Sequence, residues 1–239
     1  MNEPFCKITA LAILAVFYGC YLIKMLLQRS KGIRTDQMGV GKSGTALRVE
    51  VVMKIATAVV PIAELLSIFL LKQCPPIPIR IAGAAIGILG VIVFIISVAT
   101  MRDSWRAGVS ETDRTELVTD GIYSVSRNPA FLAFDLVYLG ILCMYFNWPL
   151  LAVSAFAAVM FHLQIVLVEE KFLLRAFGEE YAAYKRRVNR YLGRKSAATP
   201  PTSSFRSRPA TTVTSASAGN SRRSARRRFR NFGERFCNF

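Results

Sequence analysis

Long apolar stretches separated by polar segments dominate the hydropathy pattern of this chain. A membrane-spanning helix needs about 20 consecutive, mostly apolar residues. Five stretches approach or exceed that length, namely residues 8–27, 49–71, 79–100, 129–146 and 150–168. The pattern therefore predicts an all-α, polytopic membrane protein with about five transmembrane helices.

The polar residues between and after these stretches predict how the helices are joined. Asn147-Trp148-Pro149 leaves almost no connector between the fourth and fifth spans, so we expect them to form an antiparallel hairpin. In residues 169–192 the apolar side chains recur near helical spacing, which indicates an amphipathic helix outside the bilayer. Gly178 lies inside this segment and argues against one unbroken helix.

Basic residues are concentrated in three polar segments, residues 28–50, 101–128 and the part of the chain after 168. Cytosolic loops of membrane proteins carry an excess of Lys and Arg. Five spans with the N-terminus outside would place all three basic segments in the cytosol. The sequence therefore predicts an outside N-terminus and a cytosolic C-terminus.

The formal net charge of +16 is unevenly distributed. Residues 194–239 hold eleven Lys or Arg against one acidic residue and so contribute +10. They are rich in Ser, Thr, Ala and Pro and cannot bury enough apolar surface to fold. We therefore predict a membrane-embedded domain over residues 1–193 and a disordered basic tail over 194–239. The tail either contacts anionic lipid or nucleic acid nonspecifically or stays solvated.

Some kinds of site are disfavoured by the residue pattern. The five cysteines are widely spaced and include no Cys-x-x-Cys pair, so neither a disulfide framework nor a metal site is indicated. Residues 39–43 read Gly-Val-Gly-Lys-Ser, which superficially resembles a phosphate-binding loop. Position 36 is Asp where that motif needs Gly, and no strand-like run comes before it. We do not expect nucleotide binding there.

Two carboxyl groups lie inside predicted spans. Glu64 lies near the centre of the second span, close to Pro61, and Asp135 lies two turns into the fourth. A carboxylate at membrane depth is costly and marks a candidate functional site. Alternatively, Glu64 is protonated or bonded to another helix beside a proline kink. The two residues also suggest a transporter, but five spans without an internal repeat argue against one.

The polar segment before the fourth span ends in a helix-start pattern. Residues 121–131 read Gly-Ile-Tyr-Ser-Val-Ser-Arg-Asn-Pro-Ala-Phe. Asn128 can cap the free N–H groups of the helix, and Pro129 suits the first helical position because its missing N–H is not needed there. On these residues alone, the pattern indicates a capped transmembrane helix that starts at the membrane surface.

Two motifs that flank the predicted hairpin add to this interpretation. They read Thr-Glu-Leu-Val at 115–118, Gly-Ile-Tyr at 121–123 and Arg-Asn-Pro at 127–129, and then Glu-Glu at 169–170, Phe-Gly-Glu-Glu-Tyr at 177–181 and Tyr184. Over roughly residues 80–192 the chain thereby resembles the isoprenylcysteine carboxyl methyltransferase and phospholipid methyltransferase family of integral membrane enzymes. The resemblance implies a methyltransferase with S-adenosylmethionine as methyl donor and a lipophilic acceptor at the cytosolic membrane face.

The resemblance also implies which residues bind the donor. They are Thr115, Glu116, Leu117, Val118, Tyr123, Arg127, Asn128, Pro129, Ala130, Phe131 and Glu169. Glu169 can pair with the ammonium group of S-adenosylmethionine, while Arg127 and the N–H groups at the start of the fourth helix can attract its carboxylate. Backbone groups of residues 115–118 can hold the adenosine. An antiparallel hairpin would bring Pro129 and Glu169 together at the cytosolic face.

The acceptor side is less defined. In the carboxyl methyltransferase branch an Arg four residues before the matched Glu orients the acceptor carboxylate, whereas this chain has Ile165 there. His162, Gln164 and Arg106 are our acceptor-side candidates, with His162, the one His of the chain, as a general base or as an ordinary packed side chain. Methyl transfer mainly needs proximity and orientation. The alternative function is a non-enzymatic membrane adaptor that acts through its basic tail.

Overall fold

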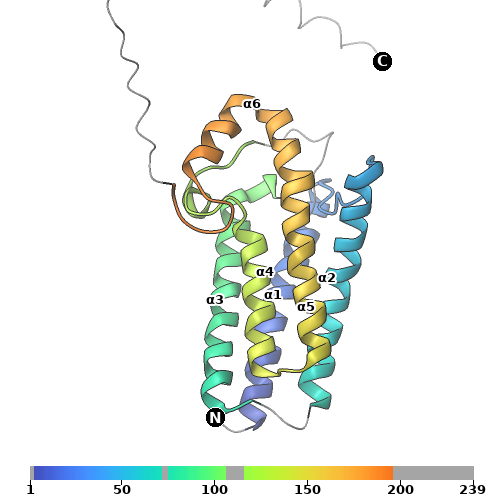
Figure 1. The fold of residues 1–239 in the computed structure, drawn as a ribbon, viewed down its shortest axis with the longest axis vertical. Coiled ribbons are helices and arrows are strands. Elements are labelled where there is room, and N and C mark those ends of the chain that lie inside the picture. The colour runs from blue at the N-terminus through green and yellow to red at the C-terminus, as the bar shows by residue number, and fades with distance from the viewer. Residues whose placement is uncertain (1–2, 72–74, 106–115, 196–239) are drawn as a thin grey trace, which may run out of the picture. The chain divides into compact units, whose positions relative to one another are not determined.

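The computed structural model describes residues 3–71, 75–105 and 116–195 (Figure 1). Two of the predicted site residues, Arg106 and Thr115, lie outside the described residues. So does nearly all of the predicted basic tail, so its disorder stays a prediction.

The described part of the chain is helical. Its six α-helices are α1 (Glu3–Ser30), α2 (Gly44–Leu70), α3 (Ile77–Met101), α4 (Pro129–Met144), α5 (Trp148–Gln164) and α6 (Glu170–Arg187). Two 3₁₀ turns, η1 (Arg102–Ser104) and η2 (Gly121–Ser124), precede α4, and a π-helical turn, η3 (Ile165–Glu169), joins α5 to α6. The described residues contain no β-strand beyond one isolated bridge between Val188 and Arg194. The all-α prediction is confirmed.

The helices explain the apolar stretches of the sequence. α1, α2, α3 and the continuous helix from α5 into α6 are each long and apolar enough to cross a membrane, and α4 is a shorter apolar helix of 16 residues. α3, α4 and α5 each begin with a Pro in the first turn, where its missing N–H costs nothing. At the start of α5 the side chain of Asn147 also caps the N–H of Leu150 at 2.9 Å. A multi-pass membrane protein is therefore confirmed.

Glycines hold α3 against α4. A Cβ atom added to Gly140 would lie 2.6 Å from the backbone N of Gly87 and 2.7 Å from the backbone O of Gly83. Only residues without a side chain permit two helices to approach so closely, as small residues commonly do in membranes. Gly90 has the same role, since a Cβ there would meet the backbone of Val137 at 2.9 Å.

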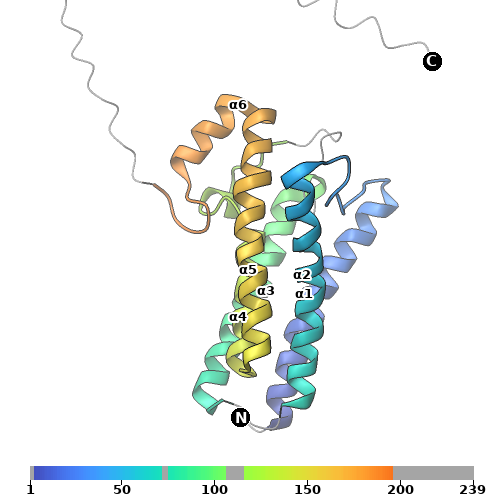
Figure 2. The ribbon, with the colours of Figure 1, turned by 45° about the vertical axis from the view of Figure 1, so that its right-hand side comes forward.

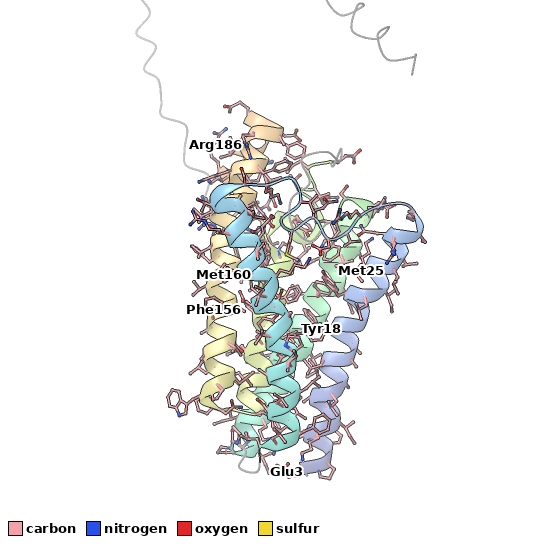
Figure 3. The ribbon with its side chains drawn as sticks, turned by 90° about the vertical axis from the view of Figure 1, so that its right-hand side faces the viewer. Glu3, Tyr18, Met25, Phe156, Met160 and Arg186 are labelled. Carbon is pink, nitrogen blue, oxygen red and sulfur yellow. The ribbon has the colours of Figure 1, made fainter. Side chains whose placement is uncertain are left out.

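α6 turns back over the end of the helix bundle that carries the loops after α1 and α3, which we call the α6 end (Figure 1). The turn is at Gly178, whose φ of 50° lies in the region that favours glycine, so the predicted break is confirmed. α1 and α2 diverge toward the same end (Figures 2 and 3). The hydrophobic core lies between α1, α3 and α4, where the rings of Phe17, Phe94 and Phe134 contact one another.

Candidate functional site

A cavity of about 500 Å³ lies at the α6 end of the bundle. Its wall includes ten of the eleven residues predicted to bind a methyl donor, namely residues 116–118, Tyr123, residues 127–131 and Glu169. The eleventh, Thr115, lies outside the described residues. The structure therefore brings the two sequence motifs together around one space, because the hairpin of α4 and α5 places the start of α4 beside the end of α5.

The first turn of α4 contributes free backbone donors to this wall. Pro129 has no N–H, and the N–H of Leu132 bonds to the carbonyl of Asn128 at 3.2 Å. The N–H groups of Ala130 and Phe131 have no acceptor within the helix. Asn128 was expected to cap them, but that expectation is wrong, since its side chain makes no cap and its amide donates to the carbonyl of Arg190 at 3.0 Å. The start of α4 is therefore open toward the cavity.

Arg127 is held by α6. Its guanidinium donates to the hydroxyl of Tyr181 at 2.9 Å and pairs with Glu170 at 3.1 Å. Lys185 and Arg190 bind the same carboxylate at 2.7 and 2.8 Å. Burial alone would raise the pKa of Glu170, but these bonds and the charge of Arg127 outweigh it and lower the pKa to about 2. The positive charge at the start of α4 is therefore largely compensated.

Both α6 and the chain after it are bonded to residues 121–128, the segment that leads into α4. The hydroxyl of Tyr184 donates to the carbonyl of Tyr123 at 2.6 Å. The N–H of Arg127 donates to the carbonyl of Asn189, and the N–H of Gly193 donates to that of Val125. Leu117 packs on the same side of α6, beside Tyr181 and Tyr184. α6 thus covers the cavity and is fixed to the segment whose residues line it.

Glu169 reaches the cavity from the last residue of the π-helical turn. Taking the fifth span to end at Val168, its carboxyl lies just outside the membrane-spanning segment. Burial raises the pKa of this carboxyl to about 7, while a hydrogen bond from Gln164 acts against the rise and the charge of Glu50 adds to it. A half-buried carboxyl of this kind gains most from a cationic ligand, because a cation would favour its charged form.

Behind Glu169 lies a buried polar network. Gln164 is fully buried and donates to Glu50 at 3.2 Å. Glu50 is also fully buried and accepts from Lys42 at 2.5 Å and from the N–H of Gly39 at 2.6 Å. The lysine of the Gly-Val-Gly-Lys-Ser stretch is thus occupied by an internal carboxylate. This ion pair gives Lys42 a structural role that needs no phosphate ligand.

The structure does not place the described acceptor-side candidates on the cavity wall. His162 is exposed, and its Nδ1 lies 2.7 Å from the hydroxyl of Tyr191. Gln164 reaches the cavity only through Glu169. Ile165, at the position where the family resemblance expects an Arg, is fully buried and does not line the cavity. Arg106 lies outside the described residues, whereas its neighbour Trp105 does line the cavity.

The sequence interpretation missed the part of the wall that α1 and α2 supply. Tyr18, Tyr21 and Leu22 come from α1, and Met53, Thr57, Ala58 and Pro61 come from α2. The motif resemblance starts near residue 80, so it gave no information about these helices. One sequence feature could have pointed to these helices, namely Pro61, which lies one turn before the carboxyl group of Glu64 in the second predicted span. Lys54 and Asp36 also line the cavity, and they form an ion pair with each other.

Comparison with known proteins gives matches in the same part of the chain. Residues 79–180 match the model of a family described as phospholipid methyltransferase. Over 112 residues the chain is 34% identical to the cobalt-zinc-cadmium resistance protein CzcN of Cupriavidus metallidurans, which covers 46% of this chain and 49% of that protein. Over 72 residues it is 36% and 32% identical to the protein-S-isoprenylcysteine O-methyltransferases of Saccharomyces cerevisiae and Schizosaccharomyces pombe, 30% of each chain.

The chain thus spans half or less of the length of the curated relatives it matches. The matched family segment runs from α3 to the middle of α6. It includes the part of the cavity wall that α3, the start of α4 and the first half of α6 supply, and it leaves out the part from α1 and α2 as well as Tyr181 and Tyr184.

Proposed function

We propose that this chain transfers a methyl group from S-adenosylmethionine to a lipophilic acceptor at the cytosolic membrane face. The match of residues 79–180 to the phospholipid methyltransferase family model and the similarity to two protein-S-isoprenylcysteine O-methyltransferases support this proposal. One observation carries the proposal. A single cavity is lined both by the motif residues around the start of α4 and by apolar residues of α1 and α2. Donor and acceptor can therefore meet in one space.

The charges around the cavity fit the amino-acid part of the donor. The uncapped N–H groups of Ala130 and Phe131, at the positive end of the α4 dipole, suit a carboxylate. Glu169 suits the ammonium group, and Gln164 orients it from behind. When bound, the donor supplies a methyl group that is already activated by its positive sulfur. The protein then needs mainly to hold and align the two reactants.

The opposite side of the cavity fits a molecule that arrives from the bilayer. Leu22 on α1 and Ala58 on α2 line the cavity, yet both are exposed on the surface of the helix bundle. α1 and α2 diverge toward the α6 end (Figure 2). A lipophilic acceptor can therefore enter sideways between these two helices. Because Ile165 replaces the Arg that would orient a carboxylate, the prenylcysteine carboxyl group is not favoured as the acceptor.

In this proposal the acceptor-side candidates have different roles. Gln164 positions Glu169 and does not touch the acceptor. His162 bonds to Tyr191 and does not line the cavity, whereas Arg106, which lies outside the described residues, stays our acceptor-side candidate. Transfer of a labelled methyl group from S-adenosylmethionine to membrane lipid should therefore fall less in His162→Ala than in Arg106→Ala.

The distribution of Lys and Arg supports a cytosolic α6 end. With an outside N-terminus, five spans would put the basic segments at residues 28–50, 101–128 and after 168 in the cytosol. A glycosylation reporter fused to the N-terminus should be modified, and one fused to the C-terminus should not. Modification of the C-terminal reporter alone would reverse the proposed orientation.

The donor site is tested by calorimetry on the purified protein with S-adenosylmethionine. The wild type should bind, and Glu169→Ala should weaken binding by about tenfold to a hundredfold, the effect of one hydrogen bond to a charged group. Glu179→Ala is the matched control, because the side chain of Glu179 is 94% exposed and it is not part of the cavity wall. Absence of binding by the wild type would sink the proposal.

A further inference from the structure

A buried ion pair lies at the α6 end of the bundle, outside the segment that matches the family model. It joins Lys42, in the loop before α2, to Glu50, near the start of α2, and their side chains are 5% and 0% exposed. The carboxylate of Glu50 also accepts from the N–H of Gly39 at 2.6 Å and from the amide of Gln164 at 3.2 Å. A buried ion pair is often no more stabilising than apolar side chains of the same size. Stability alone therefore does not account for this pair.

Gln164 connects the ion pair to the turn that carries Glu169. It is the last residue of α5, and the π-helical turn of residues 165–169 follows it directly. In such a turn an N–H bonds to the carbonyl five residues earlier, as the N–H of Glu170 does to Ile165. Glu169 therefore stands one turn beyond Gln164 on one side of the helix, and α2 packs against the same turn. A change at the ion pair would reach Glu169 by both routes.

The charges beside Glu169 do not balance. Beyond the effects of burial and of Gln164, the charge of Glu50 raises the pKa of Glu169 and the charge of Lys42 lowers it. Two carboxyl groups thus share one ammonium group, and that ammonium group is bonded to Glu50 at 2.5 Å. Among the described residues, Glu169 forms no ion pair of its own, and it lines the cavity. Its carboxylate is therefore available to a cation that enters the cavity.

We propose that Glu50 is a positioning residue for Glu169, because it holds Lys42 away from that carboxylate and fixes the turn that carries it. The proposal rests on the proposed function in one respect, since it takes the cation that pairs with Glu169 to be the ammonium group of the methyl donor. Without Glu50, the flexible side chain of Lys42 would be free to pair with Glu169 and would compete with the donor. The lysine of the Gly-Val-Gly-Lys-Ser stretch thereby gains a part in donor binding without touching the donor.

The other titratable groups that face Glu169 do not change charge near neutral pH. Glu170 stays ionised, because its ion pairs outweigh burial and lower its pKa to about 2. Tyr123 of η2 and Tyr181 of α6 stay neutral, because burial raises the pKa of both phenols. Among these four groups, Glu169 is therefore the one that titrates near pH 7.

Infrared titration of the full chain in lipid nanodiscs measures the charge of Glu169 without any ligand. The band of its protonated carboxyl group is the one that Glu169→Gln removes, and its midpoint should lie near pH 7. Glu50→Gln should lower the midpoint by about one pH unit, because the repelling charge is gone and Lys42 can pair with Glu169. Lys42→Met should raise the midpoint, because the charge that lowers it is lost. If one variant does not fold, the other still tests the proposal.

Glu3→Gln is the matched control for the titration. It removes the acid of another ion pair, whose cation, Arg80, has a side chain that is 4% exposed, close to the 5% of Lys42. Neither Glu3 nor Arg80 lines the cavity, and Figure 3 shows Glu3 at the opposite end of the bundle. The midpoint of Glu169 should therefore keep its wild-type value in this variant.

The titration has clear contrary outcomes. A general disturbance of the fold would not move the midpoint in opposite directions in the two variants of the ion pair. Midpoints that stay at the wild-type value in Glu50→Gln and Lys42→Met, or that move in the same direction, would overturn the proposal.

Donor binding tests the positioning role by loss and rescue. At about pH 8, above the pKa of Glu169, calorimetry should show S-adenosylmethionine binding about tenfold more weakly to Glu50→Gln than to the wild type. The double variant with Lys42→Met and Glu50→Gln leaves no unpaired charge and no competing lysine, so it should recover most of the affinity. A double variant that binds as weakly as Glu50→Gln would contradict the competition by Lys42.

The two measurements separate this proposal from the proposed function. If the midpoints move apart as expected but the wild type binds no donor, the arrangement around Glu169 stands and the methyltransferase does not. If the wild type binds the donor but the midpoints do not move, the methyltransferase stands and the role of Glu50 does not.

Discussion

At the scale of single residues, the carboxylate of Glu170 connects the segments that meet at the α6 end. It is 5% exposed and is bonded by Arg127, Lys185 and Arg190. Arg127 comes from the segment that leads into α4, whereas the other two come from α6 and the chain after it. One carboxylate therefore joins the wall of the cavity to its cover.

Glu170→Gln should consequently destabilise the protein. It leaves Arg127, which is 8% exposed, without its counter-charge, and breaking such a pair from one side costs about 3–5 kcal/mol when burial is complete. Because Lys185 and Arg190 are partly solvated, we expect about 2–3 kcal/mol at neutral pH. Thermal unfolding in detergent measures the loss, with the exposed Glu180→Gln as control. Equal melting temperatures of the two variants would contradict this role.

The pH dependence of the difference follows from the sign of the shift. The pKa of Glu170 is lowered to about 2 in the folded protein, from about 4.3 in an unfolded chain. Its stabilising contribution is therefore complete above about pH 4.5 and is lost as the pH falls toward 2. The melting-temperature difference between wild type and Glu170→Gln should shrink over that interval. A difference that is constant from pH 6 to pH 3 would contradict the assignment.

At this scale, the sequence predicts the role of a residue when that role depends only on its neighbours in the chain. Pro129 starts its helix as predicted, because that preference is local. Asn128 has the residue type of a helix cap, but its amide is claimed by the carbonyl of Arg190, 62 residues away. Gln164 is predicted to act on the acceptor side, and the structure shows it bonded to Glu50, 114 residues away in the chain. Long-range partners of this kind leave no pattern in a single sequence.

At the scale of elements, the contact between α3 and α4 carries the greatest steric constraint. Gly140 approaches the backbone of Gly83 and Gly87 so closely that a Cβ would lie within 2.7 Å of backbone atoms. Backbone atoms in a helix cannot turn aside as a flexible side chain can. The first turn of α4, whose N–H groups face the cavity, is therefore placed by a contact deep in the bundle.

Gly140→Ala should force the two helices apart. We expect a loss of stability of about 2 kcal/mol or more, at the upper end of the range for overpacked cores, and weaker S-adenosylmethionine binding because the start of α4 shifts. Gly19→Ala is the matched control, since a Cβ at Gly19 of α1 meets nothing within 4 Å. It should be neutral or stabilise by up to about 1 kcal/mol, through helix propensity alone. Thermal unfolding measures the stability of both variants. Equal destabilisation of the two would contradict a close contact between α3 and α4 at Gly140.

Element boundaries were predictable where the sequence changes abruptly from polar to apolar. The five spans, the hairpin and the break at Gly178 all follow from such changes. The π-helical turn of residues 165–169 was not predicted, because every residue in it suits an α-helix as well. The turn matters for the site, since it is where Glu169 leaves the register of α5 and reaches the cavity.

At the scale of the whole molecule, the cavity combines two parts with different sequence signals. The part around α4 and α6 carries compact motifs, so its residues could be named from the sequence. The part from α1 and α2 is made of ordinary apolar side chains, whose placement depends on how the helices diverge. The proposed entry of lipid between α1 and α2 therefore has no signal in the sequence, and it can be tested directly.

Ala58 and Val59 on α2 provide that test. Both are exposed on the surface of the bundle, but only Ala58 lines the cavity. Ala58→Trp should fill the gap between α1 and α2, whereas Val59→Trp adds the same bulk on a neighbouring part of the helix surface. Methyl transfer from labelled S-adenosylmethionine to a membrane lipid extract should fall roughly tenfold or more in Ala58→Trp and stay near the wild-type rate in Val59→Trp.

Donor binding makes the result specific to entry from the bilayer. The proposed donor site lies at the start of α4, so calorimetry should give the same S-adenosylmethionine affinity for both tryptophan variants as for the wild type. Lost donor binding in Ala58→Trp would mean that the substitution deforms the whole cavity, and the lateral route would lose its support. Equal transfer by the two variants would show that the acceptor enters from the α6 end, and it would then have to pass the cover formed by Tyr181 and Tyr184.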